Sequence, residues 1–251
     1  MALVSTQEKG KVSIITISNP PMNVLAVEVL HELDAAIKKV EKTDAKVVVL
    51  RGEGKTFCAG ANIKQMAEFD RSKGIKFGKL GQSVMMGVER SKKVYIACIH
   101  GFAMGGGCEI SLACDFRVAE KSATIGQPEI KIGIITGFGG TQRLPPLIGL
   151  GRAKDLLITG RSISGEEAHK IGLVDRLVEN GKAFEEAERL ANEIAGMPGV
   201  ALKLTKEMTN AFMKKAFREE MMAFAECFRT NDQKEGMRAF LEKRKPNFTD
   251  D

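Results

Sequence analysis

Val94-Tyr-Ile-Ala-Cys-Ile-His-Gly-Phe-Ala-Met-Gly-Gly-Gly-Cys-Glu109 is a stretch that joins an apolar run to a series of glycines ending in an acid. Residues 94–99 have the continuous apolar character of a buried strand, and the glycine-rich residues that follow open into a helix. Apolar, β-branched runs at 12–17, 47–50 and 116–119 predict further strands. Because turns rich in Gly and Ala lead from these strands into helices, the sequence predicts an α/β fold.

Helical spacing of apolar residues marks the segments between and after the strands. From Val24 to Val40 it is accompanied by acids early and lysines late, as the helix dipole favours. After about Asn180 no further strand is predicted, and helices are expected at 182–195, 200–212 and 215–243. We therefore expect an α/β core over 1–195 and a C-terminal helical region over 196–251. The apolar faces of that last region fit two interpretations, packing on the chain's own core or a subunit interface.

The composition is that of a globular protein without a membrane segment. Apolar residues make up 43% and charged residues 28% of the 251 residues. No apolar run reaches the roughly 18–20 residues of a membrane span, and the first residues do not form a signal sequence. The five cysteines form no CxxC pair, which predicts reduced thiols and a cytoplasmic location. The three histidines lack metal-ligand spacing, so no metal site is expected.

Basic residues exceed acidic ones by 38 − 32 = 6. This excess fits a solvated basic surface or an anionic ligand that carries phosphates. A nucleic-acid partner is disfavoured, because the chain has one tyrosine, no tryptophan and no motif that interleaves basic and aromatic residues.

Two glycine segments carry the first chemical signal. In Phe57-Cys-Ala-Gly-Ala-Asn-Ile-Lys64 and in Ala103-Met-Gly-Gly-Gly-Cys108, small residues lead into a predicted helix. Small residues let a ligand approach the backbone, and helix N-termini present unpaired N–H groups. Two such groups from separate loops could hold one carbonyl oxygen as an oxyanion hole. Tight helix–strand packing is the alternative explanation of either segment.

Two glutamates carry the second signal. Glu109 ends the glycine run, and Glu129 follows Gly126-Gln-Pro in a turn, with a predicted pair of strands between the two acids. Two converging acids can hold a water molecule, one taking a proton from it while the other donates a proton to a neighbouring atom. If both acids act, the chain adds or removes water; if one acts, it moves a proton. Singly, Glu109 could instead serve the helix dipole, and Glu129 could be an exposed acid.

At these residues the sequence resembles the crotonase, or enoyl-CoA hydratase/isomerase, superfamily. The resemblance runs nearly end to end and is specific for the family more than for one reaction. It is carried by Phe57-Cys-Ala-Gly-Ala-Asn-Ile-Lys64, Gly101-Phe-Ala-Met-Gly-Gly-Gly-Cys-Glu-Ile110, Cys114-Asp115, Gly126-Gln-Pro-Glu-Ile-Lys-Ile-Gly133, Gly137-Phe-Gly-Gly-Thr-Gln-Arg-Leu144, Ala168-His-Lys-Ile-Gly-Leu-Val-Asp175 and Glu235-Gly-Met-Arg-Ala-Phe-Leu-Glu-Lys-Arg-Lys245.

The resemblance implies a spiral of repeated β-β-α units followed by a helical trimerisation region, with a trimer or a hexamer of two trimers as the assembly. It implies an acyl thioester of coenzyme A as the substrate and no separate cofactor. By motif position, the backbone N–H groups of Ala61 and Gly106 would hold the thioester oxygen, and Gly137 would help to hold water. The positions expected to contact coenzyme A are Pro21, Met22, Asn62, Ile63, Lys64, Phe240 and Lys243.

Hydratases of this family carry glutamates at both positions, whereas isomerases commonly keep only the later one. The resemblance therefore favours a lyase of fatty acid metabolism, a short-chain enoyl-CoA hydratase with crotonyl or 3-hydroxypropionyl chains. Glu109 would activate water, and Glu129 would exchange the proton at the carbon beside the thioester. An isomerase or a specialised acyl-CoA enzyme is the alternative within the family. Two departures from the family pattern, Asn62 for an aspartate and Thr136 for a proline, bear on chain preference and rate.

The alternative outside the enzyme class is a hydratase homologue that binds RNA. Such a protein would carry a lysine-rich stripe on one helix. The run Lys38-Lys39-Val-Glu-Lys42 is short and mixed in charge, so it does not favour this interpretation.

Overall fold

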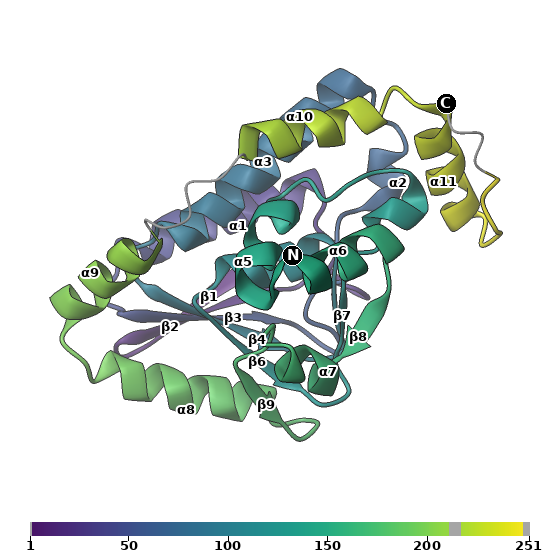
Figure 1. Cartoon of the computed structure of the whole chain (residues 1–251). Helices are drawn as coiled ribbons and strands as arrows, with labels where there is room; N and C mark the ends of the chain where they lie inside the picture. Colours follow the sequence, from purple (N-terminus) through teal and green to yellow (C-terminus); the bar gives the residue numbers. More distant parts are fainter. Residues whose placement is uncertain (1, 211–216, 248–251) are drawn as a thin grey trace.

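The computed structural model describes residues 2–210 and 217–247. Within them a six-stranded sheet has the order β1-β2-β3-β4-β6-β9, and a three-stranded sheet has the order β5-β7-β8 (Figure 1). The strands of the larger sheet are β1 Val4–Lys9, β2 Val12–Ile17, β3 Val47–Gly52, β4 Val94–Ile99, β6 Phe116–Glu120 and β9 Arg176–Val178. Those of the smaller sheet are β5 Phe102–Met104, β7 Thr124–Gly126 and β8 Ser162–Ser164.

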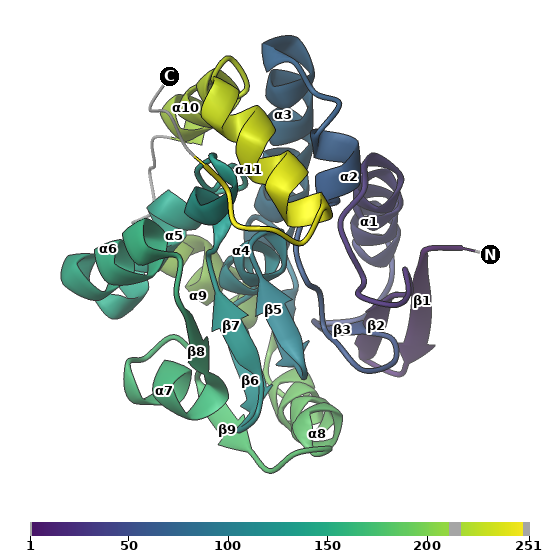
Figure 2. The ribbon, with the colours of Figure 1, turned by 90° about the vertical axis from the view of Figure 1, so that its right-hand side faces the viewer.

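Helices surround and connect the two sheets (Figures 1 and 2). They are α1 Val27–Val40, α2 Ile63–Met66, α3 Arg71–Glu89, α4 Gly106–Ala113, η1 Glu129–Ile132 (a 3-10 helix), α5 Gly140–Ile148, α6 Leu150–Thr159, α7 Gly165–Lys170, α8 Ala183–Ala195, α9 Gly199–Asn210, α10 Phe217–Cys227 and α11 Asn231–Leu241. No helix of the residues described combines the length and the apolar character needed to cross a membrane.

The chain repeats one path between the two sheets. It passes from β4 in the larger sheet to β5 in the smaller one and then into α4, and from β6 to β7 and then into η1. The preceding segment of the chain follows the same path. After β3, Cys58 pairs with Ala103 of β5 in the smaller sheet, and the chain then enters α2. The predicted spiral of β-β-α units is confirmed.

The larger sheet is buried on both faces. Val47 and Val49 pack with α8 on one face, while Val48 and Leu50 face the core that contains α1 and α3 on the other. A strand buried on both sides is apolar at successive positions rather than at alternate ones. This burial explains the continuous apolar runs, and the strands predicted from them are confirmed.

The first helix begins later than the sequence predicts. A start at Val24 was expected, but α1 begins at Val27. Leu25 instead forms a parallel bridge with Ala61, in which its N–H donates to the carbonyl of Gly60 over 2.8 Å. That pairing keeps the backbone extended, so tertiary contact overrides helical spacing at these residues.

The C-terminal region differs from the sequence expectation at one point. A single helix over 215–243 was predicted, but α10 ends at Cys227 and α11 begins at Asn231. Thr230 between them is extended and caps α11, because its side chain accepts a hydrogen bond from the N–H of Gln233. The helix expected at 200–212 is α9, and residues 211–212 and 215–216 of the two predictions lie outside the described residues.

The apolar faces of these helices have different surroundings. On α10 and just after it, Met221, Phe224 and Phe228 are buried, and α10 packs along α3 (Figure 1). Packing on the chain's own core therefore explains this face. On α11 Phe240 is 56% exposed, and on α9 Val200 is 73% exposed. The division of the chain at residue 195 stays a prediction.

Two glycine segments approach each other within the smaller sheet. The N–H of Cys58 donates to Phe102 and the N–H of Met104 donates to Cys58, so residues 57–61 run beside 102–107. A Cβ on Gly107 would lie 2.0 Å from the carbonyl oxygen of Cys58. A Cβ on Gly60 would lie 2.9 Å from the carbonyl oxygen of Met104. The close approach therefore depends on glycine at both positions.

We expect Gly107→Ala to destabilise the fold by about 1–3 kcal/mol, because the added methyl group meets a backbone carbonyl. Gly151→Ala is the matched control, since Gly151 is also the second residue of a helix but an added Cβ there has no atom within 4 Å. Urea unfolding measures both. The control should be as stable as the parent or slightly more stable. Equal stability of the two variants would contradict the packing described.

Candidate active site

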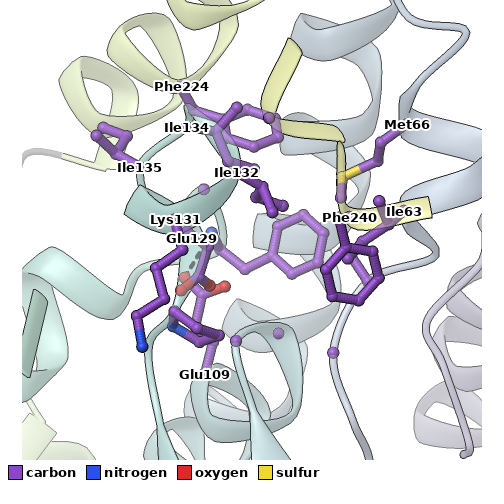
Figure 3. A pocket seen from close by; sticks show the side chains of 18 of the residues that line it. Ile63, Met66, Glu109, Glu129, Lys131, Ile132, Ile134, Ile135, Phe224 and Phe240 are labelled. Carbon is purple, nitrogen blue, oxygen red and sulfur yellow. Dashed lines mark hydrogen bonds between the residues drawn. The ribbon is translucent and has the colours of Figure 1, made fainter. Parts of the chain in front are cut away.

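A cavity of about 230 Å³ lies where the glycine segments, η1 and the C-terminal helices meet (Figure 3). Its wall is mostly apolar, with two carboxylates at one side. The lining residues are Ala59, Gly60, Ala61, Ile63, Met66, Phe77, Gly105, Gly106, Glu109, Pro128, Glu129, Lys131, Ile132, Ile134, Ile135, Gly137, Phe138, Phe224, Gly236, Phe240, Arg244 and Pro246.

Glu109 is a buried acid with a fixed orientation. It lies in the first turn of α4 and is 2% exposed. Its Oε1 accepts hydrogen bonds from the backbone N–H groups of Phe138 and Gly140, each over 2.8 Å. Burial of an acid is costly unless hydrogen bonds replace those to water. These two donors therefore both stabilise the side chain and aim it into the cavity.

The turn that supplies these donors is itself held by a buried ion pair. Arg143 on α5 donates through Nη1 to the carbonyl of Phe138 over 2.9 Å, and its Nε donates to Glu89 at the end of α3 over 2.9 Å. Both charged side chains are at most 10% exposed. This pair connects α3 and α5 to the turn that orients Glu109.

Glu129 enters the cavity from the first residue of η1. With its amide nitrogen facing the acid, Gln127 donates to both carboxylate oxygens of Glu129, over 3.0 and 3.2 Å. A Cβ on Gly105 would lie 3.0 Å from Oε1 of Glu129. The carboxylate therefore lies against the residue that precedes Gly106. The prediction that the two acids share one site is consistent with this cavity, which both of them line.

The oxyanion-hole candidates Ala61 and Gly106 line the same cavity. Ala61 pairs with Leu25 in a parallel bridge, and the two hydrogen bonds of the bridge are made by the carbonyl of Gly60 and the N–H of Asn62. The N–H of Ala61 is therefore directed away from Leu25. Gly106 is the first residue of α4, so its N–H has no acceptor within that helix. A Cβ on Gly60 would lie 3.8 Å from the nitrogen of Gly106, which places the two segments side by side.

This arrangement can perform acid–base chemistry on a polarised carbonyl compound. Two N–H groups can hold a carbonyl oxygen as it gains negative charge, and the apolar wall strengthens that interaction by excluding water. Two carboxylates beside them can remove one proton and supply another.

The remaining predicted positions divide into two groups. Ile63, Gly137 and Phe240 line the cavity, with Phe240 contributed by the same chain. Five others, Pro21 among them, lie outside its wall. Met22 accepts a hydrogen bond from the N–H of the lining residue Ala59, Asn62 caps α2 through the N–H of Gln65, and Lys64 and Lys243 are exposed. Their expected contacts with a ligand stay predictions.

Sequence analysis missed several residues that build the site. Gln127 and Arg143 act through hydrogen bonds to Glu129 and to the turn at Phe138. Gln127 lies two residues before an acid that was singled out, so its amide was a signal within the motif. Phe77 and Phe224 line the cavity from helices remote in sequence, and no local pattern connects them to it.

The cysteines of this region are packing residues. Burial raises the pKa of the Cys108 thiol well above its usual range, and the neighbouring carboxylates of Glu129 and Glu109 raise it further. Burial also raises the pKa of Cys58 to about 12. A thiol with a raised pKa is a poor nucleophile near neutral pH, so Cys108 serves packing.

Comparison with known proteins gives one family. A model of the family "Enoyl-CoA hydratase/isomerase" matches residues 7–251. A short-chain-enoyl-CoA hydratase of Clostridium acetobutylicum is 44% identical, with 96% of this chain and 95% of that protein covered. A crotonyl-CoA hydratase of Syntrophomonas wolfei is 42% identical, with 96% of each covered. The solved structure of an enoyl-CoA hydratase from Bacillus anthracis superposes with a TM-score of 0.81 at 36% identity, covering 99% of this chain and all of that one.

Proposed function

The chain belongs to the enoyl-CoA hydratase/isomerase family, and we propose that it adds water reversibly to short-chain 2-enoyl-CoA thioesters. The reaction is that of a hydro-lyase and gives a 3-hydroxyacyl-CoA. One observation carries the assignment to a hydratase: Glu109 and Glu129 both line the cavity that contains Ala61 and Gly106. Crotonyl-CoA is the proposed first substrate. Coenzyme A enters as part of the substrate, and no further cofactor is proposed.

The proposed mechanism uses one proton transfer at each acid. The N–H groups of Ala61 and Gly106 hold the thioester oxygen and stabilise the negative charge that moves onto it. Glu109 takes a proton from water as the water oxygen bonds to the β-carbon. Glu129 gives a proton to the α-carbon as the enolate charge returns. The acids together hold one proton before and after the reaction, so the proton transfers balance.

Glu109→Gln and Glu129→Gln should each lower hydration of crotonyl-CoA by roughly 10²–10⁴-fold, because general acid–base catalysis contributes about that much. Binding of the acyl-CoA should change far less. Loss of the enoyl-thioester absorbance measures the rate. Glu28→Gln, at an exposed glutamate on α1, is the control and should retain full activity. Near-full hydration by Glu109→Gln would show that Glu109 does not activate the water and would contradict the two-acid mechanism.

Substitutions of Gly106, at the start of α4, test the proposed oxyanion hole directly. Gly106→Pro removes the N–H, and proline is accepted at the first position of a helix. Gly106→Ala keeps the N–H while adding the same Cβ, which would lie 3.2 Å from Leu25 and 3.3 Å from Phe138. We expect turnover to be about 10²–10³-fold lower in the proline variant than in the alanine variant. Equal turnover of the two folded variants would show that this N–H does not hold the thioester oxygen.

We propose that further copies of the chain cover α9, giving a trimer or a hexamer. Along this helix Val200, Leu204 and Met208 recur every four residues and are 73%, 49% and 66% exposed. Contiguous exposed apolar surface of this kind is typical of subunit interfaces. Because none of the five cysteines forms a disulfide, we also propose a reducing compartment such as the cytoplasm.

Leu204→Asp should shift the assembly towards monomers, because an unpaired charge is costly to bury in an interface. Light scattering of the purified protein measures the mass. Lys42→Asp, at an exposed position after α1, should leave the assembly unchanged. Phe228 is unsuitable for this test, since it is buried in the chain's own core. A monomeric parent protein at working concentration would contradict the proposed assembly.

A further inference from the structure

Phenylalanine rings contribute to the apolar wall of the cavity. Phe77 from α3, Phe138 from the turn before α5 and Phe224 from α10 all contribute to its wall. Figure 3 shows Phe224 across the cavity from Glu109, with Ile132 and Ile134 between. An acyl chain that places its thioester beside Gly106 and its reacting carbons at the acids would extend towards Phe224.

Glycines fix the positions of two of these rings. A Cβ on Gly137 would lie 2.8 Å from Phe224, and a Cβ on Gly78 would lie 3.5 Å from the same ring. A Cβ on Gly81 would lie 2.1 Å from the ring of Phe138. Each ring therefore lies directly on backbone that has no side chain. Because the backbone is held in α3 and in the turn that supports Glu109, the rings have little room to withdraw.

Other aromatic rings close the space behind this wall. Phe77 and Phe138 have ring centroids 5.1 Å apart, and Phe69 lies 5.3 Å from Phe77. Phe228 lies 5.2 Å from Phe224. Phe69 and Phe228 do not line the cavity, so they support the wall without facing a ligand. A longer chain could not pass the first layer without displacing the second.

We propose that Phe224 ends the acyl pocket and sets the upper limit on the length of the acyl chain that is hydrated. This inference rests on the proposed function. It assigns chain-length selection to the C-terminal region, which packs α10 onto α3 and so presents the ring to the cavity. Substrate extended by a few methylenes is rejected because the closed end cannot receive them.

The chain offers a matched pair of variants. Phe224 and Phe228 are both phenylalanines, are 2% and 3% exposed, and lie four residues apart against α3, but only Phe224 lines the cavity. Removing either ring leaves a cavity in the core and should lower stability to a similar degree. A change that depends on facing the ligand should follow only from removal of Phe224.

The experiment measures kcat/KM for crotonyl-CoA, 2-hexenoyl-CoA and 2-octenoyl-CoA. In Phe224→Ala the ratio of octenoyl to crotonyl activity should rise at least about 10-fold over the parent protein, since a methylene in an apolar pocket changes specificity by about that factor or more. In Phe228→Ala the ratio should stay within about twofold of the parent. Phe224→Leu, which leaves a smaller void, should shift the ratio in the same direction and serves if the alanine variant does not fold.

The outcomes separate this inference from the proposed function. A parent protein that does not hydrate crotonyl-CoA overturns the proposed function itself. A parent that does, together with an unchanged ratio in the folded Phe224 variants, overturns the assignment of chain length to Phe224. An equal rise in Phe228→Ala also overturns it, because general loosening of the core would then account for the shift.

Discussion

Contact between two backbone segments without intervening side chains is the constraint on which the rest of the site depends. Residues 57–61 and 102–107 can run side by side because Gly60 and Gly107 have no Cβ to meet the opposite carbonyl oxygens. That contact brings Ala61 and Gly106 to one cavity. It also sets the start of α4, and with it the position of Glu109 three residues further on. Ala61, Gly106 and the first acid are thus placed by the same packing.

The buried acid in turn depends on a second set of contacts, which hold its hydrogen-bond donors in place. Glu109 is stable away from water because two N–H groups donate to it, and those groups belong to a turn that Arg143 holds against α3 through Glu89. The same turn contains Gly137, on which Phe224 lies. Orientation of the acid and the position of the Phe224 ring in the cavity wall are therefore linked through one short segment. A core with native packing density transmits such constraints, because a shift at one contact must be accommodated at the next.

Local sequence was informative where local physics decides the structure. Continuous apolar runs located the buried strands, and the glycine segments together with Glu109 and Glu129 located the cavity. The family resemblance added the order of the elements and is confirmed by the family match. Prediction failed where contacts between residues far apart in the sequence decide the local structure.

Those distant contacts act at particular residues. The start of α1 is delayed by the pairing of Leu25 with Ala61, and the last predicted helix is divided at Thr230. Phe224 meets Gly137 in the cavity wall although more than 80 residues separate the two in the sequence, so no local spacing could indicate the contact. The central claim can be tested by a crystal structure with butyryl-CoA, a saturated chain that cannot take up water. The thioester oxygen should lie within about 3 Å of the nitrogens of both Ala61 and Gly106, with the β-carbon facing Glu109 and Glu129. A thioester oxygen bound away from both nitrogens would contradict the account.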